Sequence, residues 1–496
     1  MHMNKMRPLS ACLRATLVAK AGSWTEELDV AVLKLHNASS PEEMLHAERA
    51  IHDAISRRAD DVVGEILQRR VRDQALLEAA TSEARRRGKS AGLHMHSRGE
   101  KATTVRLLGG TDFKLRTRLM LPATAKDPAA RKGVGKRGKG GSGVYPVLLK
   151  LGITDQATPA LKALVAREVV AASSVKCARG SLHQHDLRVE HTTALRLTYA
   201  LGRQAIAARD AAIDAPGTGS ELTGKFVIIS LDGGRVRVRG STDPETGKYQ
   251  APWREPKVLT IYVVREDGKR DPDFRMLIDG TMGDADAVVA LLIGHLRLLG
   301  AQHAHHVRLL ADGGSWIWNR AQAIREAIGI PATRWSERLD YYHAVQYLGK
   351  IVEPISSWSD AERKAWMEDA KARLYEGLAE EVIACIRLLP DPPVGSGKSA
   401  KNLVEKDTAI LFFGRHRDRI GYLGTQLDKT TMGSGAVESA IRRTVNLRMK
   451  GNSIFWLEDH AEPMLHLRAC LVTERWDDMV LRAITEPMWP APMAAA

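Results

Sequence analysis

The run FVIISLD, residues 226–232, constrains the fold of this chain more than any other segment. A continuous apolar run of this length is typical of a strand that is buried on both faces in an α/β sheet. The run ends at Asp232, and the two glycines that follow predict a tight turn. Residues 235–239 then alternate arginine and valine, so we expect a second strand with one apolar and one basic face.

Strand and helix patterns alternate after this turn. Strands are predicted at residues 257–264, 306–312 and 332–340, and helices at residues 284–300, 317–329 and 341–352. Three antiparallel strands followed by alternating helices and strands is the order of the ribonuclease H fold. We therefore expect an α/β fold with a ribonuclease H-like catalytic core. Asp279 is interpreted as a turn residue and Asp284 as a helix cap.

Two of the predicted strands end in an aspartate. In the ribonuclease H fold the first and fourth strands are neighbours, so Asp232 and Asp312 are expected at one end of the sheet. Close carboxylates repel each other, and a bound divalent cation reverses this because it prefers oxygen ligands. The expected cofactor is Mg²⁺, as two ions about 3.5–4 Å apart that serve phosphoryl transfer. Mn²⁺ is expected to substitute.

Glu438 is the candidate third carboxylate. It lies in TTMGSGAVESAIRRTVNLRMK, where apolar residues recur at four-residue steps and predict a helix with a buried stripe. The stripe consists of Val437, Ile441, Val445 and Met449. The alternative interpretation is an ordinary helix carboxylate that pairs with Arg442.

Five segments together resemble a known family: LDGGRVRVR, LADGGSWIW, LDYYHAVQYL, GSGAVESAIRRTVNLRMKGNSIFW and LRACLVTERWDD. They resemble bacterial insertion-sequence transposases of the ISKra type, within the Mutator-like set of Asp-Asp-Glu enzymes. The resemblance extends from about residue 146 to residue 480. It implies that Asp232, Asp312 and Glu438 are the catalytic metal ligands. It also implies supporting roles for Asp340 and His343, although His343 has the alternative of a packed histidine below the sheet. Arg442, one turn after Glu438, is a further supporting candidate.

Cysteine usage argues against a zinc site. The four cysteines are far apart, with no Cys-x-x-Cys pair. Relatives in the resembled family often carry paired cysteines ahead of the catalytic region, whereas residues 100–145 contain none here. We therefore expect no zinc, and the isolated thiols favour a reducing compartment.

The charge balance indicates a polyanionic partner. Lys and Arg number 73 against 59 for Asp and Glu, a net charge of +14. Nucleic acid is the simplest such partner, and a basic protein without one is the alternative. The residues expected to contact DNA lie in a glycine-rich linker at 130–143, in a helix-turn-helix-like region, beside Asp232 and near Glu438. They are Lys132, Lys136, Arg137, Lys139, Arg188, Arg196, Arg235, Arg237, Arg443, Arg448 and Lys450.

Seven segments describe the expected organisation. They are a helical N-terminal domain for DNA binding or dimerisation (1–90), short strands with the basic linker (91–145), the helix-turn-helix-like region (146–218), the first part of the core (219–350), a helical insertion (351–430), the Glu438 helix with C-terminal helices (431–480) and a tail (481–496). In the insertion, four aromatic residues either fill a core or stack on an unpaired base: Trp358, Trp366, Phe412 and Phe413.

The sequence therefore predicts a DNA transposase. It would bind the terminal inverted repeats of an insertion sequence as a homodimer or higher oligomer, cleave DNA strands as an endonuclease and transfer them. The alternatives are a non-catalytic DNA-binding derivative and a ribonuclease H-like nuclease. No apolar run reaches the roughly 18 residues of a membrane span, so we expect a cytoplasmic, nucleoid-associated protein without a membrane partner.

Overall fold

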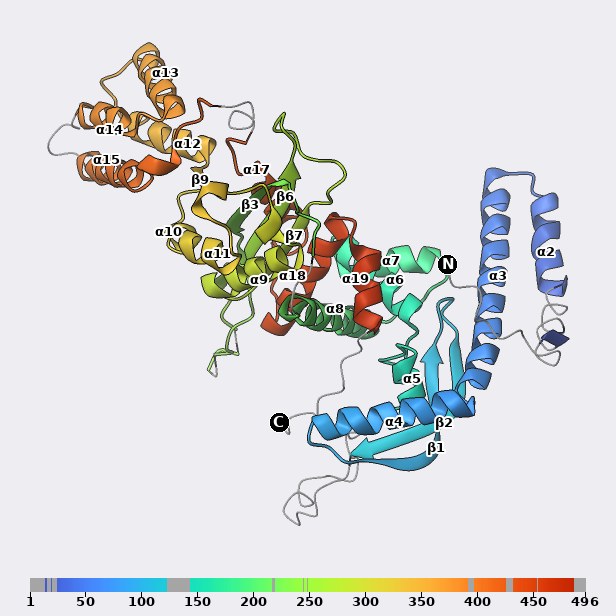
Figure 1. Cartoon of the computed structure of the whole chain (residues 1–496). Coiled ribbons are helices and arrows are strands. Elements are labelled where there is room, and N and C mark those ends of the chain that lie inside the picture. Colours follow the sequence, from blue (N-terminus) through green and yellow to red (C-terminus); the bar gives the residue numbers. More distant parts are fainter. Residues whose placement is uncertain are drawn as a thin grey trace. The chain divides into compact units, whose positions relative to one another are not determined.

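The computed structural model describes residues 14–15, 19, 25–122, 143–215, 219–243, 245–247, 249–390, 397–424, 431–452 and 454–485. The chain divides into two compact units, one formed by residues 1–207 with 480–496 and the other by residues 208–479. Figure 1 traces their elements along the sequence. Of the helices in the described ranges, none has the length and apolar character needed to cross a membrane.

The first unit opens with helices and a hairpin. In chain order these are α2 (Thr25–His36), α3 (Pro41–Arg70), α4 (Gln74–Ser90), β1 (Met95–Arg106) and β2 (Asp112–Pro122). The strands are antiparallel and longer than the sequence predicts. Asp60 on α3 is buried and accepts the backbone N–H groups of Gly109 and Thr111 at 2.9 and 3.0 Å. Because both donors lie in the hairpin turn, this carboxylate fastens the hairpin to α3.

Four more helices follow, where the predicted helix-turn-helix-like region implies two, and the last of them continues into the second unit. They are α5 (Pro146–Lys150), α6 (Pro159–Ala171), α7 (Val175–Gln184) and α8 (His191–Asp214). The additional helix is α7, capped by Ser174, whose hydroxyl accepts the N–H of Cys177 at 3.1 Å. Arg188 is exposed in the loop before α8. Arg196 on α8 donates to the backbone carbonyl of Asp155 at 2.7 Å. Lys132, Lys136, Arg137 and Lys139 lie outside the described residues.

The second unit is built on a five-stranded mixed sheet in the order β7-β6-β3-β8-β9. Its strands are β3 (Phe226–Gly233), β6 (Lys257–Val264), β7 (Leu277–Thr281), β8 (His306–Ala311) and β9 (Trp335–Leu339). β6 runs antiparallel to β3 and β7, whereas β8 runs parallel to β3 and β9. The expected α/β class is confirmed as a mixed α/β fold, and the apolar run at 226–232 lies at the centre of the sheet.

Two strand predictions are wrong. Residues 235–239 do not join the main sheet, because β4 (Val236–Arg237) pairs with β5 (Trp253–Arg254) in a small separate sheet. The place of the third antiparallel strand is taken by β7, which the sequence pattern missed because the strand is short and contains a charged residue. Asp279 therefore lies within a buried strand and not in a turn.

Helices cover the sheet and lead into its site. The first set is α9 (Ala285–Leu298), α10 (Ser315–Trp318), α11 (Ala321–Ala327) and α12 (Tyr341–Val352). Asp284 caps α9 as predicted, since its side chain accepts the N–H of Ala287 at 2.9 Å. The C-terminal set is α17 (Gly435–Ile441), the π-helical turn η6 (Arg442–Asn446) and α18 (Glu458–Val472). The helix that follows, α19 (Trp476–Thr485), continues into the first unit. α17 packs on β3 and β6, and α18 packs on β7.

Between β9 and α17 lies a helical group that begins after α12. It comprises α13 (Asp360–Glu376), α14 (Ala379–Arg387) and α15 (Gly397–Arg415). Ser359 and Glu362 form a reciprocal capping box at the start of α13. Phe412 and Phe413 are buried, and Trp358 and Trp366 pack partly buried against the same core. These four aromatic residues therefore fill the helical core rather than present free ring faces.

Candidate active site

Asp232 and Asp312 lie at the same end of neighbouring parallel strands. Residues 226–229 of β3 are opposite residues 306–309 of β8. Continued beyond the paired residues, this register places Asp232 level with Asp312. Both side chains are partly exposed. The sheet therefore brings two carboxylates to one edge, as the sequence predicts.

Glycines let the chain turn immediately after each aspartate. The N–H of Gly233 bonds to Oδ1 of Asp232 at 2.6 Å, and the N–H of Gly314 bonds to Oδ1 of Asp312 at 2.9 Å. A Cβ at Gly313 would collide with the ring of Phe412. These local bonds hold the two carboxylates at the strand ends, where a ligand can approach them.

The surroundings of Asp232 disfavour its charged form. Burial, the largest cause, and the nearby charges of Asp312 and Glu438 together raise its pKa to about 6. The N–H of Gly233 and the charge of His343 act in the opposite direction. Because three carboxylates influence one another here, protonation of Asp232 relieves repulsion that a cation would relieve equally well.

Glu438 approaches the site from the first turn of α17. Its side chain is 51% exposed, and Oε1 lies 3.6 Å from Nδ1 of His343. Within the described residues no ion pair joins Glu438 to Arg442, whose side chain is exposed. The predicted apolar stripe on this helix is buried and anchors it against the sheet: Val437, Ile441, Val445 and Met449. The π-helical turn that follows α17 is a feature often found at functional sites.

Asp340 connects the two helices that border the site. It is buried, and it caps α12 by accepting the N–H of His343 at 3.0 Å on Oδ1. Its Oδ2 accepts the N–H of Ser434 at 2.6 Å and also the Ser434 hydroxyl. Burial alone would raise the pKa of Asp340, but the bonds from His343 and Ser434 outweigh it and lower the pKa to about 2. Since Ser434 immediately precedes α17, Asp340 positions the helix that carries Glu438.

His343 is held between carboxylates. Its Nδ1 lies 3.3 Å from Oδ2 of Asp340. The bond to Asp340 raises the pKa of His343, burial opposes this, and the charges of Asp340, Asp312 and Glu438 add to the increase. Asp340, His343 and Glu438 also offer ligand atoms within 4.8 Å of one another. Because both Asp340 oxygens already accept hydrogen bonds, Asp340 is better suited to positioning than to metal binding.

The sequence interpretation missed one cation at this edge. Lys257 begins β6 opposite Gly233. Its Nζ lies 2.9 Å from Oε2 of Glu255 and 4.5 Å from the ring centroid of Trp316, which follows Asp312 closely in the chain. Lys257 is buried, and its charge is paired with Glu255. In the sequence, the only sign of this cation is that a lysine begins an otherwise apolar strand.

The predicted DNA-contacting residues of this unit differ in the exposure of their side chains. Arg235 and Arg237 are exposed, while the valines between and after them are buried, so the predicted basic face is present. Lys450 is exposed as well. Arg443 is partly exposed and donates to the carbonyl of Val472 at 3.3 Å.

Arg448 requires a correction. It is only 6% exposed, and its guanidinium carbon lies 5.4 Å from the ring centroid of Trp456. A buried guanidinium packed on an indole supports the fold and does not reach a DNA phosphate in this structure.

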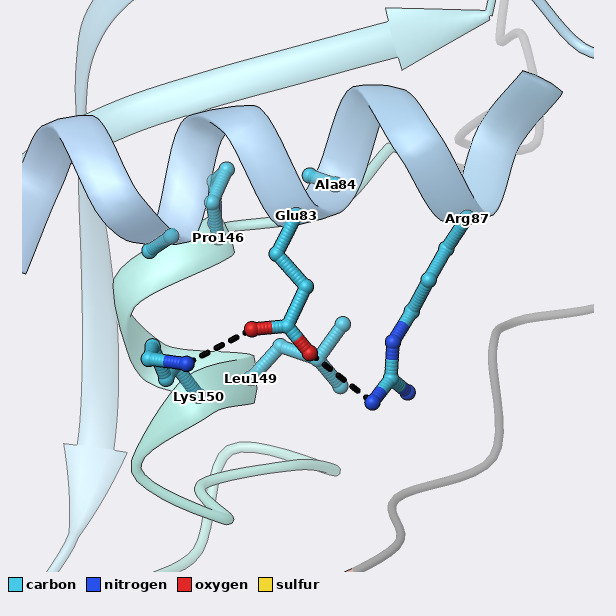
Figure 2. A pocket seen from close by; sticks show the side chains of 7 residues that line it. Glu83, Ala84, Arg87, Pro146, Leu149 and Lys150 are labelled. Atoms are coloured by element: carbon cyan, nitrogen blue, oxygen red, sulfur yellow. Dashed lines mark hydrogen bonds and ion pairs between the residues drawn. The ribbon is translucent and has the colours of Figure 1, made fainter.

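The first unit contains a small pocket between α4 and α5 (Figure 2). Glu83 points toward Lys150 and Arg87 there and pairs with them at 2.6 and 2.8 Å. The bond from Lys150 and the neighbouring positive charges lower the pKa of Glu83. Because these charged groups are paired with one another and the rest of the lining is apolar, we interpret the pocket as a packing contact between the two helices.

Comparisons with known proteins add little to this picture. No protein-family model and no curated protein matches the chain. Among solved structures, the chain is similar to the Drosophila P element transposase strand transfer complex, at 12% sequence identity and a TM-score of 0.24. The match covers 68% of this chain and 86% of the other. A likeness of this size carries no weight for fold or function, which have to be judged from the residues themselves.

Proposed function

We propose that the protein is a metal-dependent DNA transposase of the Asp-Asp-Glu type. Asp232, Asp312 and Glu438 would hold two Mg²⁺ ions, which Mn²⁺ can replace, and no zinc takes part. The observation that supports the proposal is the register of β3 and β8, which places Asp232 level with Asp312, together with the charges of Asp312 and Glu438 that add to burial in raising the pKa of Asp232. Hard oxygen ligands with excess negative charge suit Mg²⁺.

The strand order supports a ribonuclease H-like core. Three antiparallel strands are followed by two parallel ones, with β3 central and next to β8. This order places the ends of β3 and β8 together, which is where the carboxylates lie. The helical group between β9 and α17 corresponds to the proposed insertion.

The side chains of this unit have separate tasks in the proposed reaction. When bound, Mg²⁺ supplies an activated attacking oxygen and stabilises the leaving oxygen of the phosphodiester. Asp340 keeps α17 and His343 in place, and the exposed Arg235, Arg237 and Lys450 attract the DNA backbone. The products are a cleaved strand with a free 3′-hydroxyl and then a joined strand, formed at the terminal inverted repeats of an insertion sequence by a homodimer or higher oligomer in the cytoplasm.

The test is a strand-transfer assay with the full chain, Mg²⁺ or Mn²⁺, and DNA that carries the two ends of the element encoding the protein. We expect joined products that vanish in Asp312→Ala. A matched control is Glu368→Ala, which removes an exposed carboxylate from α13 and should leave the products unchanged.

Two results would replace the proposal. Cleaved ends without joined ones, lost in Asp312→Ala, would identify a nuclease with the same site. Binding to the ends without cleavage under either metal would identify a non-catalytic DNA-binding protein.

A further inference from the structure

A small sheet projects from the strand that carries Asp232. After Gly233 and Gly234 the chain enters β4, which pairs with β5. The segment at 454–456 joins this sheet through two backbone bonds. Trp456 donates to the carbonyl of Arg237 at 2.9 Å, and Arg239 donates to the carbonyl of Trp456 at 2.8 Å. The sheet is therefore attached both to β3 and to the chain that follows the Glu438 helix.

One face of this sheet is packed down firmly. Val236 and Val238 are buried, and so is Trp456. The indole N–H of Trp456 donates to the carbonyl of Met449 at 2.8 Å. Met449 belongs to the buried stripe that begins on α17. The apolar face of the small sheet is thus fixed against the segment that positions Glu438.

The opposite face combines arginines with aromatic rings. The guanidinium carbon of Arg237 lies 4.8 Å from the ring centroid of Trp253 and 5.9 Å from that of Phe455. That of Arg239 lies 4.6 Å from the ring centroid of Tyr249, which meets Phe455 edge to face at 5.5 Å. We call these five residues the arginine–aromatic surface.

The arginine–aromatic surface is open and carries excess positive charge. Trp253 is 49% exposed and Tyr249 is 37% exposed. Within the described ranges, no carboxylate forms an ion pair with Arg237 or Arg239. The neighbouring Arg254, by contrast, pairs with Glu458 at 3.2 Å. The two cations suit an anionic ligand, and the three rings suit a ligand with a flat group that can stack on them.

An unpaired nucleic acid strand has this chemistry. Its bases stack on exposed aromatic rings and on guanidinium planes, and its phosphates attract the arginine charges. A continuous duplex offers phosphates but no free base faces, so its bases cannot stack on the rings. A surface built for a duplex alone would need the arginines only.

We propose that the arginine–aromatic surface binds unpaired nucleotides of the strand that enters the carboxylate site. The proposal rests on the proposed function in taking that strand to be DNA that is cut or joined there. Its position supports it, because Arg235 and the small sheet follow Asp232 after only two glycines. Nucleotides next to the reacting phosphate would be held apart from their complement while the carboxylates act on it.

Binding can be measured without any chemistry. Fluorescence anisotropy of the full chain in EDTA would compare a labelled 12-nucleotide oligo-dT strand with a blunt duplex whose strands have 12 nucleotides. We expect Trp253→Ala to weaken binding of the single strand by roughly 5- to 100-fold, the range for loss of one stacked base. Binding of the blunt duplex should change by less than about twofold.

Conservative and control variants identify the cause of any loss. Trp253→Phe should recover most of the single-strand binding because it keeps a ring, and Tyr249→Ala should repeat the loss at a second ring. Arg265→Ala removes an exposed arginine just beyond the other end of β6, and we expect it to leave single-strand binding unchanged. Circular dichroism would establish that each variant is folded.

The outcomes separate this proposal from the proposed function. Unchanged single-strand binding in both Trp253→Ala and Tyr249→Ala overturns it, and so does an equal loss for duplex and single strand. Strand transfer by the unmodified chain would still support the transposase in either case. A selective loss of single-strand binding without any strand transfer would instead support the surface and count against the transposase.

Discussion

The same sheet carries two aspartates in opposite surroundings. Asp279 on β7 is enclosed by groups that neutralise it: Nε2 of His295 at 2.9 Å, Nδ1 of His466 at 3.0 Å and Nη1 of Arg209 at 3.4 Å. Asp232 on β3 instead has Asp312 and Glu438 as charged neighbours. The first aspartate joins α8, α9 and α18 to the sheet, whereas the second lies at an open edge.

The pKa values follow from this difference. Burial alone would raise the pKa of Asp279, but the charges of His466 and Arg209, with the bonds from the two histidines, hold it well below its usual range. Burial would likewise lower the pKa of His466, but Cys470 and Asp279 raise it to about 10. For Asp232 the N–H of Gly233 and the charge of His343 do not outweigh burial and the neighbouring carboxylates, and its pKa is raised to about 6.

The contrast teaches that burial alone does not mark a functional carboxylate. The chain satisfies Asp279 with its own cations, which is typical of a structural clamp. It leaves Asp232 without matching charge, and this is typical of a site that awaits a cation. The two aspartates should therefore respond to the same chemical change in opposite ways.

Asp232→Asn gives the largest expected effect on activity. We expect DNA cleavage to fall on the order of 1,000-fold or more, because charge stabilisation by the metal is worth several kcal/mol. The free energy of unfolding in EDTA should stay the same or rise, since a repulsive charge is removed. Mg²⁺ at about 100 times its Kd should stabilise the unmodified chain by about 2.7 kcal/mol but not the variant. Cleavage kinetics and urea denaturation measure these quantities, and a loss of metal-free stability would show that Asp232 is a clamp like Asp279.

Asp279→Asn should have the opposite profile. Removing one member of a buried charge cluster leaves His466 and Arg209 uncompensated, and we expect the free energy of unfolding to fall by about 3–5 kcal/mol. The Mg²⁺-dependent gain in stability should persist at temperatures where the variant is folded. Urea denaturation with and without Mg²⁺ would measure both. A variant that is as stable as the unmodified chain would remove the basis of the comparison.

Asp340→Asn should have an intermediate effect. Asp340 positions Glu438 through Ser434 and holds His343, so we expect cleavage to fall about 10- to 100-fold, as for residues that orient metal ligands. The pKa of His343 should fall, which would move the pH profile of cleavage in a way that a merely destabilised fold would not. Asp284→Ala, which removes the cap of α9, is the control and should lower stability by about 1 kcal/mol without changing that profile. An unchanged pH profile in Asp340→Asn would count against the positioning role.

Some of these features are readable from the sequence and others depend on distant partners. The run at 226–232 identifies the central strand because it needs only local periodicity. β7 cannot be predicted from local periodicity, because Asp279 interrupts its apolar pattern. This aspartate is tolerated in a buried strand because Arg209, His295 and His466 surround it. The arginine alternation at 235–239 predicts the two faces correctly. The pairing with β5 cannot be predicted in this way, because it depends on contacts with residues distant in the sequence. The sequence predicts Arg448 as a DNA contact because it cannot show that Trp456 packs against its guanidinium.

The pH dependence of stability separates the two aspartates most clearly, through Asp232 itself and through His466 beside Asp279. Asp232 has a folded pKa of about 6, above the value of about 4 in an unfolded chain, so the folded state binds its proton more tightly. The stability that this provides in EDTA is present below about pH 4 and is lost as the pH rises toward 6. His466 has a folded pKa of about 10 against about 6.5 when unfolded. Its contribution is present below about pH 6.5 and is lost as the pH rises toward 10.

Two variants assign these windows by urea denaturation across the pH range. Asp232→Asn should flatten the decline between about pH 4 and 6 and leave the alkaline decline unchanged, whereas His466→Gln should flatten the decline between about pH 6.5 and 10. Mg²⁺ binds the carboxylate form and competes with its proton, so adding it should reverse the acidic slope in the unmodified chain but not in Asp232→Asn. If Mg²⁺ left the acidic slope unchanged, Asp232 would titrate without binding metal. The site at Asp232 would then no longer differ from the cluster around Asp279 in its response to a cation.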